Sequence, residues 1–401
     1  MGYANYLFML KGYKVSLYQN SAQAELLERH FGSCRWVYNH MIVINQKRYH
    51  RTGKGMSGYD MQNMLPKLKK QYPWLTEVNS QSLQMVCHNL AESYNRFFKK
   101  KGGYPSFKKK GGKDSFSAIN NSRFEGNKIR LPKLGLIRFR GGDMPEGDVK
   151  RFTISKEAGK YYASVLIDDG IELPKPKTPK KILGIDLGLI DMVVTSDGQS
   201  FKAPKHLRKA QAELRKRQKS LSRKVKGSNR RKKAKLRLAV CHQKINNQRK
   251  DFNHKLSHSL VQGSDSQTAF ALENLNVTGM MRNHNSARSI ADAGWNQFKT
   301  FLTYKAAAVG RQVIEVDRFF PSSKTCSACG VVRQSLPLSC RKWTCNDCGY
   351  VHDRDINAAI NIANEAARNV VSDSKRGGRV SPVAIQASVI EARMCKSGRK
   401  P

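Results

Sequence analysis

The chain has 401 residues, which is long enough for two or three domains with buried cores. Its 73 lysines and arginines against 30 aspartates and glutamates give a formal net charge of +43, an excess that predicts a polyanionic partner, most simply a nucleic acid. A membrane surface is the rival polyanion, but no apolar run approaches the ~18 residues that a spanning helix needs, and the N-terminal apolar run is too short for a secretory signal. We therefore expect an intracellular protein that works on nucleic acid and does not bind a membrane.

Two amphipathic helices are predicted in the first hundred residues. Apolar residues recur at helical spacing over about 22–47 and again over about 80–101, and the simplest role of both stripes is core packing. Ser21 is a plausible N-cap of the first helix, although the residues that follow do not complete a capping box. We expect residues 21–101 to form a helical insertion.

Alternating segments on both sides of this insertion predict strands. They are residues 13–18, residues 128–140, and a hairpin over 151–168 with its turn near 157–159. We expect residues 1–20 and 102–172 to form one small antiparallel β-barrel. The prolines of residues 173–180 then predict a stiff linker and the main domain boundary.

A second, α/β domain is predicted after this linker. An apolar strand ends at Asp186 and two short antiparallel strands follow, an arrangement with which RNase H-like folds open. A later buried strand over 268–277 carries Glu273. The remaining predicted elements are a helix over 294–310, a strand over 312–317 and a helix that ends near residue 370. We expect residues 181–319 and 353–370 to form an RNase H-like domain, and residues 371–401 to be a flexible tail.

A strongly basic block lies inside this domain. Residues 202–255 hold 21 lysines and arginines against two acids, and heptad-spaced leucines with a break near Gly227 predict an antiparallel helical hairpin over 202–260. A solvated charged helix is the alternative, but too few acids are interspersed to form i,i+4 ion pairs. We expect the hairpin to lie along nucleic-acid phosphates. Its candidate contacts are Arg215, Arg217, Arg223, Lys224 and Arg249.

Three carboxylates are the candidate catalytic residues. Asp186, Glu273 and Asp355 lie on two strands and at a helix start, 87 and 82 residues apart, so that no local structural role accounts for all three. An RNase H-like arrangement brings such acids to one end of the sheet, where two Mg²⁺ ions ~4 Å apart would activate a water and stabilise the leaving oxygen of a phosphodiester. Any single acid could be a turn former or a cap, and we assign the cap to Asp353.

Two CxxC pairs predict one structural zinc ion. Cys326, Cys329, Cys345 and Cys348 each offer a thiolate, and two such pairs close a tetrahedral site with no open position for substrate. Cys340 is interpreted as a bystander. A redox role is disfavoured because the pairs lack a strand–helix context of the thioredoxin kind. We expect residues 320–352 to form this zinc module.

Several of these segments resemble a known family. They are GIDLGL (184–189), ALENLNV (271–277), FPSSKTCSACG (320–330), CNDCGYVH (345–352) and DRDINAA (353–359). Together they are similar to TnpB, the RNA-guided nucleases of bacterial and archaeal insertion sequences, which are related to type V CRISPR effectors. The resemblance extends over nearly the whole chain.

The resemblance implies a fold and a function. The fold would be a wedge β-barrel interrupted by a helical recognition lobe, then a RuvC nuclease domain with an inserted zinc-binding target-loading module. Asp186, Glu273 and Asp355 would be the RuvC acids. The protein would bind a guide RNA from the transposon end and cut both strands of double-stranded DNA beside a short motif. It would be a monomer in its RNA complex and would work in the prokaryotic cytoplasm.

In relatives, the short DNA motif is read by the recognition helices and the barrel. Asparagine and glutamine can read adenine bidentately, although surface or capping roles are an equally good interpretation here. The candidate readers are Asn79, Ser80, Gln81, Gln84, Asn120 and Asn121.

Two rival functions remain open. A strand-joining transposase is disfavoured because no tyrosine with paired histidines is evident. A nuclease-inactive RNA- or DNA-binding regulator of transposition is disfavoured because all three acids are present.

Overall fold

The computed structural model describes residues 8–141, 144, 146–337 and 339–375. These residues fall into two compact units, and the division lies between Ile171 and Glu172, next to the predicted linker. In the part of the chain that is described, no helix is long and apolar enough to cross a membrane.

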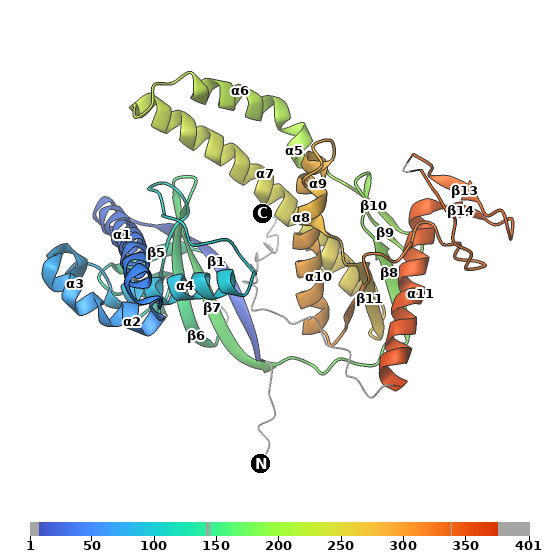
Figure 1. Ribbon diagram of the computed structural model, residues 1–401, viewed down its shortest axis with the longest axis horizontal. Coiled ribbons are helices and arrows are strands. Elements are labelled where there is room, and N and C mark those ends of the chain that lie inside the picture. The colour runs from blue at the N-terminus through green and yellow to red at the C-terminus, as the bar shows by residue number, and fades with distance from the viewer. Residues whose placement is uncertain (1–7, 142–143, 145, 338, 376–401) are drawn as a thin grey trace, which may run out of the picture. The chain divides into compact units, whose positions relative to one another are not determined.

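The first unit combines one antiparallel sheet with a layer of helices (Figure 1). Its strands are β1 (Phe8–Tyr18), β2 (Asp114–Ala118), β3 (Arg123–Glu125), β4 (Lys128–Leu131), β5 (Gly135–Arg140), β6 (Asp148–Glu157) and β7 (Lys160–Glu172). Its helices are α1 (Ser21–Thr52), α2 (Gly58–Asn63), α3 (Leu65–Gln71), the 3₁₀ turn η1 (Pro73–Thr76) and α4 (Ser80–Phe98). The two predicted helices and the predicted hairpin, with its turn at residues 158–159, are confirmed.

The prediction of a closed β-barrel is wrong. The seven strands follow the order β2-β6-β7-β1-β5-β4-β3, so β2 and β3 are edges, and no ladder joins them among the described strands. β3 has only three residues, and the one ladder it forms within the described ranges is with β4. The curled sheet instead brings the Phe124 ring of β3 to 5.3 Å from the Phe152 ring of β6. Aromatic packing therefore takes the place of the closing hydrogen bonds.

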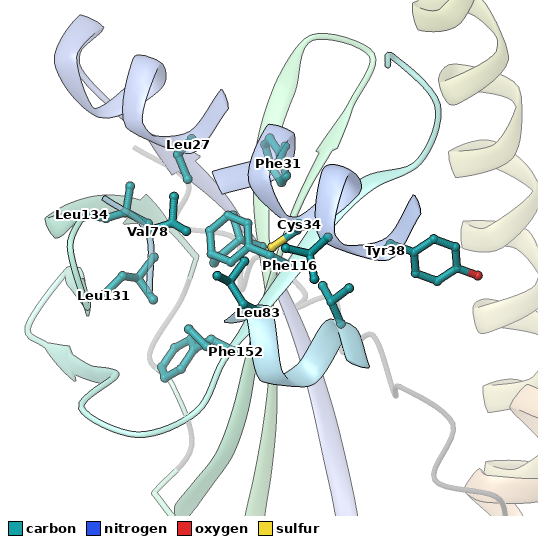
Figure 2. Packing of buried hydrophobic residues seen from close by; sticks show 14 of the residues in the cluster. Leu27, Phe31, Cys34, Tyr38, Val78, Leu83, Phe116, Leu131, Leu134 and Phe152 are labelled. Atoms are coloured by element: carbon teal, nitrogen blue, oxygen red, sulfur yellow. The ribbon is translucent and has the colours of Figure 1, made fainter. Parts of the chain in front are cut away.

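The core of the first unit forms where α1 and α4 cover the sheet. Leu27, Phe31 and Cys34 of α1 face Phe116 of β2 and Leu83 of α4, as Figure 2 shows. These apolar residues recur on α1 at the spacing of one helix face.

The first helix begins with a complete capping box, which the sequence analysis did not predict. Asn20, and not Ser21, is the N-cap: its side chain accepts a hydrogen bond from the Gln23 backbone N–H, and the Gln23 side chain accepts one from the Asn20 N–H. Asparagine and glutamine replace the more familiar serine and glutamate in this exchange.

The second unit contains a five-stranded mixed sheet, a two-stranded ribbon and seven helices among its described residues. The sheet order is β10-β9-β8-β11-β12. The strands are β8 (Lys181–Asp186), β9 (Asp191–Thr195), β10 (Ser200–Lys202), β11 (Thr268–Glu273), β12 (Val313–Val316), β13 (Lys342–Thr344) and β14 (Val351–Asp353). The helices are α5 (His206–Lys209), α6 (Gln211–Ser222), α7 (Asn229–Gln262), α8 (Val277–Met280), α9 (Ala287–Ala293), α10 (Trp295–Ala308) and α11 (Arg354–Lys375).

Helices cover both faces of this sheet. The apolar side chains of β8 and β11 pack against α7 and α10 on one face, while Ala269 and Ala271 of β11 pack against Ile362 and Ala366 of α11 on the other (Figure 1). β11 is buried along almost its full length, as a central strand covered on both sides should be. α11 reaches Lys375, which is five residues into the predicted tail, and residues 376–401 lie outside the described residues.

The backbone of α11 comes very close to the sheet at Gly184. A Cβ atom on this residue would lie 1.9 Å from the Ala359 carbonyl oxygen and 2.8 Å from the Ala363 nitrogen. Because no side chain fits there, the backbone of α11 rests directly on β8. This contact places the start of α11 beside the carboxyl end of β8.

We expect Gly184→Ala to lower the free energy of unfolding by about 3 kcal/mol, because the added methyl group must push α11 off the sheet. Urea unfolding followed by circular dichroism measures this. Gly103→Ala is the control, since nothing lies within 4 Å of a Cβ at Gly103. Equal urea midpoints for both variants would contradict the close packing.

Candidate active site and metal centre

Asp186 and Glu273 lie on neighbouring strand ends. β8 and β11 run parallel with Ile185 paired to Leu272, so Asp186 and Glu273 follow this last pair at the same edge of the sheet. Adjacent strands are about 4.8 Å apart, which brings the two residues close together. Both are partly buried.

Asp355 reaches this edge from the first turn of α11. The Asp353 carboxylate accepts hydrogen bonds from the backbone N–H groups of Asp355 and Ile356, at 3.0 and 3.1 Å. Asp353 is therefore the N-cap of α11, as the sequence predicts. Asp355 is not used as the cap, and its charge acts on Asp186.

Burial raises the pKa of all three carboxylates, and neighbouring acids add to the rise at Asp186. Burial, then the neighbouring charges of Glu273 and Asp355, raise the pKa of Asp186 to about 7. Burial raises the pKa of Glu273 and of Asp355 as well. A buried acid whose pKa is raised by neighbouring carboxylates is typical of functional sites, where a bound cation removes the repulsion.

Two side chains that the sequence analysis did not single out hold these acids. The Ser322 hydroxyl donates a hydrogen bond to Glu273, and Arg341 donates to both Asp355 oxygens at 2.7 and 3.1 Å. Both come from the cysteine-bearing segment 320–352. Arg341 opposes the rise in the pKa of Asp355 through its charge. Ser322 and Arg341 reach the acids through tertiary contacts. Apart from the FPSS segment (320–323), no local sequence pattern predicts these contacts.

The four predicted cysteines form a separate cluster. The sulfur atoms of Cys326, Cys329, Cys345 and Cys348 all lie within 4.8 Å of one another, and no other group of three or more histidine, cysteine or acidic side chains in the described chain is this compact. Two pairs are 3.6 and 3.7 Å apart, close to the ~3.8 Å edge of a tetrahedron with Zn–S bonds of ~2.3 Å. Cys340 is not in the cluster, and its thiol donates to the Lys342 carbonyl.

The two halves of the cluster have the same backbone geometry. The Cys326 and Cys345 amides donate to the carbonyls of Val331 and Tyr350, and both arms turn at a left-handed glycine, Gly330 or Gly349. Backbone N–H groups of Cys348 and Asp347 lower the pKa of Cys345 to about 7. The second turn thus favours the thiolate, which is the metal-binding form of cysteine, at Cys345.

Polar side chains of α11 join the cysteine module to the acids. Asn357 accepts from the Ser327 N–H and donates to the Thr325 carbonyl, and Asn361 donates to the carbonyls of Ser322 and Thr325. These two asparagines are one helical turn apart and buried. The segment that carries Ser322 is therefore fixed to the same helix as Asp355.

The predicted basic hairpin is present as α6 and α7, with a turn at 223–228 (Figure 1). Arg215, Arg223 and Lys224 are exposed. Arg217 pairs with Glu213 and donates to the Arg237 carbonyl. Arg249 donates to the Asp292 carbonyl.

Arg215 also lines a cavity of about 500 Å³ between α5, α6 and α9, together with Arg208 and Arg288. Contact of these residues with nucleic acid stays a prediction.

The candidate motif readers come from two segments that the structure brings together. The Gln81 side chain accepts a hydrogen bond from the Asn120 backbone at 3.0 Å. Asn79 is mostly buried as the N-cap of α4, and Ser80 accepts a hydrogen bond from Lys69. Gln84 is partly buried and Asn121 has a left-handed backbone with φ of 58°. Whether they contact DNA stays a prediction.

Comparison with known proteins identifies the family. Residues 160–284 match a model described as "Probable transposase" (OrfB_IS605), and residues 295–362 match "Cas12f1-like, TNB domain". Residues 9–54 match a "Helix-turn-helix domain", although this stretch folds here as β1 and the single long helix α1.

Two full-length relatives support the same assignment. The chain is 37% identical to a "Putative RNA-guided DNA endonuclease" of Streptomyces pristinaespiralis over 94% of this chain and 95% of the relative. It is 31% identical to "Putative RNA-guided DNA endonuclease InsQ" of Escherichia coli K12, over 88% and 91%. The chain belongs to the TnpB family of transposon-encoded proteins.

The fold also resembles solved CRISPR effectors loosely. The chain matches "Structure of the mini-RNA-guided endonuclease CRISPR-Cas_phi3" with a TM-score of 0.47 and 10% identity, covering 90% of this chain and 92% of that one. At this score the resemblance supports no functional argument.

The raised pKa of Asp186 predicts a pH-dependent stability for the magnesium-free protein. Between pH 4 and 7 the folded state keeps a proton on Asp186 that the unfolded state loses, so the free energy of unfolding falls as the pH rises. We expect Asp186→Asn to stabilise the protein by roughly 3–4 kcal/mol at pH 8 and by less than about 1 kcal/mol at pH 4, where the unfolded state is also partly protonated. Urea unfolding at both pH values measures this, and equal effects at pH 4 and 8 would contradict the shift.

Proposed function

We propose that this protein is an RNA-guided, Mg²⁺-dependent DNA endonuclease encoded by an insertion sequence. It cleaves target DNA beside a short transposon-associated motif, with Asp186, Glu273 and Asp355 as its RuvC-type catalytic residues. The observation that carries this proposal is the meeting of the three acids at one sheet edge, where each acquires a raised pKa. The names of the relatives agree with it, since two of them are called RNA-guided DNA endonucleases.

The three carboxylates fit magnesium by their chemistry. Their oxygens are hard ligands, which Mg²⁺ prefers, and their mutual repulsion is relieved by divalent cations. Two bound Mg²⁺ ions would supply an activated water and charge stabilisation at the leaving oxygen. Ser322 holds Glu273 in place, and Arg341 offsets the charge of Asp355 before magnesium is bound.

The four cysteines fit one structural zinc ion. Four thiolates at tetrahedral spacing make a closed soft-ligand site, so its role is to fold the target-loading module and not to bind substrate. His352 lies next to this site, with its Nε2 3.0 Å from the Cys326 sulfur. Because α11 begins two residues later, zinc binding also steadies the start of the helix that carries Asp355.

The nucleic-acid partners follow from charge and family. The guide RNA comes from the transposon end and the target is double-stranded DNA, and base pairing between them supplies most of the specificity. The exposed arginines and lysines of α6 and α7 bind phosphates, and the start of α4 with residues 120–121 reads the adjacent motif. The complex contains one copy of the protein and works in the prokaryotic cytoplasm on the nucleoid.

A nuclease-inactive regulator of transposition is the alternative function. It would bind the same RNA and DNA through the same basic surface but would have no need for the acids. The side chains that hold Glu273 and Asp355 in place favour the nuclease, since a binding protein has no use for such supports.

Paired substitutions in one short segment test the nuclease. We expect Asp355→Asn to slow cleavage of a guide-matched plasmid by at least about a thousandfold, because metal-ion stabilisation contributes several kcal/mol. Asp353→Asn should cleave normally, since asparagine also caps helices well. Gel shifts should show equal RNA binding by both variants. Normal cleavage by Asp355→Asn would refute this active site.

Metal analysis tests the zinc site. We expect about one zinc ion per chain, a loss of that zinc in Cys326→Ser, and full retention in Cys340→Ser, because only the first thiol belongs to the tetrahedron. Zinc-free wild-type protein, or equal loss from both variants, would show that the cluster does not bind zinc.

A further inference from the structure

Phe319 is the most exposed large apolar side chain among the described residues, with 85% of its surface accessible. Its neighbour Phe320 packs instead against the apolar cluster under α11. Burying a phenylalanine ring contributes about 1.5–3 kcal/mol, a contribution that the exposed Phe319 ring does not make.

The turn that carries this ring is held by hydrogen bonds. The Phe319 N–H donates to the Asp317 carboxylate at 2.8 Å, the Phe320 N–H donates to the Asp317 carbonyl at 3.2 Å, and the Ser322 N–H donates to the Phe320 carbonyl at 2.8 Å. The Arg318 guanidinium lies 5.9 Å from the ring centroid. A constrained turn therefore displays an aromatic face together with a cation.

This turn lies at the edge of the sheet that holds the acids. β12 runs parallel to β11 with Val316 paired to Glu273, and Phe319 follows three residues later. Ser322, three residues further on, donates its hydroxyl to Glu273. Three residues span at most about 11 Å, so the ring is displayed close to the catalytic carboxylates.

An exposed aromatic ring beside a cation matches the requirement for holding single-stranded nucleic acid. Nucleobases stack on aromatic side chains whatever their sequence, and each stacked base contributes about 1–3 kcal/mol. Arginine adds phosphate contact and cation–π attraction. A single exposed apolar residue is ordinary on a protein surface. Phe319 differs because it lies on a hydrogen-bonded turn, three residues before Ser322, whose hydroxyl donates to Glu273.

We propose that Phe319 stacks on a nucleobase of the single DNA strand that occupies the carboxylate site, and so positions the scissile phosphate. This inference rests on the proposed nuclease function and assigns to it a positioning residue. Because stacking is insensitive to base identity, Phe319 would suit an enzyme whose target sequence is chosen by base pairing.

The test uses the guide-loaded complex with a complementary single-stranded DNA target. We expect Phe319→Ala to raise KM about 5- to 100-fold, which corresponds to the loss of one stacked base. Phe319→Trp should retain the wild-type KM, and Phe319→Leu should behave like the alanine variant because it is apolar but cannot stack. Thermal unfolding of all three should match the wild type, since the ring packs against little.

A second measurement detects the stack directly. With Ca²⁺ in place of Mg²⁺ to suppress turnover, 2-aminopurine placed in turn at each position around the cut should be quenched at one position. That quenching should be lost in Phe319→Ala and kept in Phe319→Trp. Val309→Ala, which removes another exposed apolar side chain of the second unit, should change neither KM nor quenching.

An unchanged KM with undiminished quenching in Phe319→Ala would overturn the inference, and so would full activity in Phe319→Leu. Failure of the wild-type complex to cleave would instead refute the proposed nuclease. The quenching of bound DNA would then still decide whether Phe319 stacks.

Discussion

The packing of α11 on β8 at Gly184 is the constraint on which the candidate active site depends. A helix with an ordinary side chain beneath it would stand further from the sheet, and Asp355 would be carried away from Asp186. The small residues Ala359 and Ala363 complete the contact from the helix side. Asp186 and Glu273 lie at the ends of parallel strands, and Asp355 lies at the start of α11. The direct packing of the α11 backbone on the β8 backbone brings Asp355 close to Asp186.

The same helix also organises the cysteine module. Asn357 and Asn361 hold the segment from Ser322 to Ser327, and that segment in turn supplies the hydroxyl group that binds Glu273. From the other cysteine arm, Arg341 reaches Asp355. Each arm of the module therefore contacts one candidate catalytic acid, which gives a physical route by which the state of the cysteine module would affect the candidate active site.

Much of this could be predicted from the sequence where the signal was local. Asp186 and Glu273 were placed at strand ends by apolar runs, and the paired CxxC spacing predicted the cysteine cluster that the structure contains. The closed barrel was wrong because closure depends on pairing between β2 and β3, which no local pattern encodes. Ser322 and Arg341 were missed for the same reason, since their partners lie 49 and 14 residues away.

The central claim is that a guide RNA directs cleavage by this protein. The most direct test is to express the protein with its flanking DNA, sequence the RNA that co-purifies, and offer the complex a randomised target library with Mg²⁺. We expect one discrete RNA from the element's end, and cutting only of DNA that matches this RNA beside one short motif. Absence of a discrete RNA, or cutting that ignores the match, would contradict this claim.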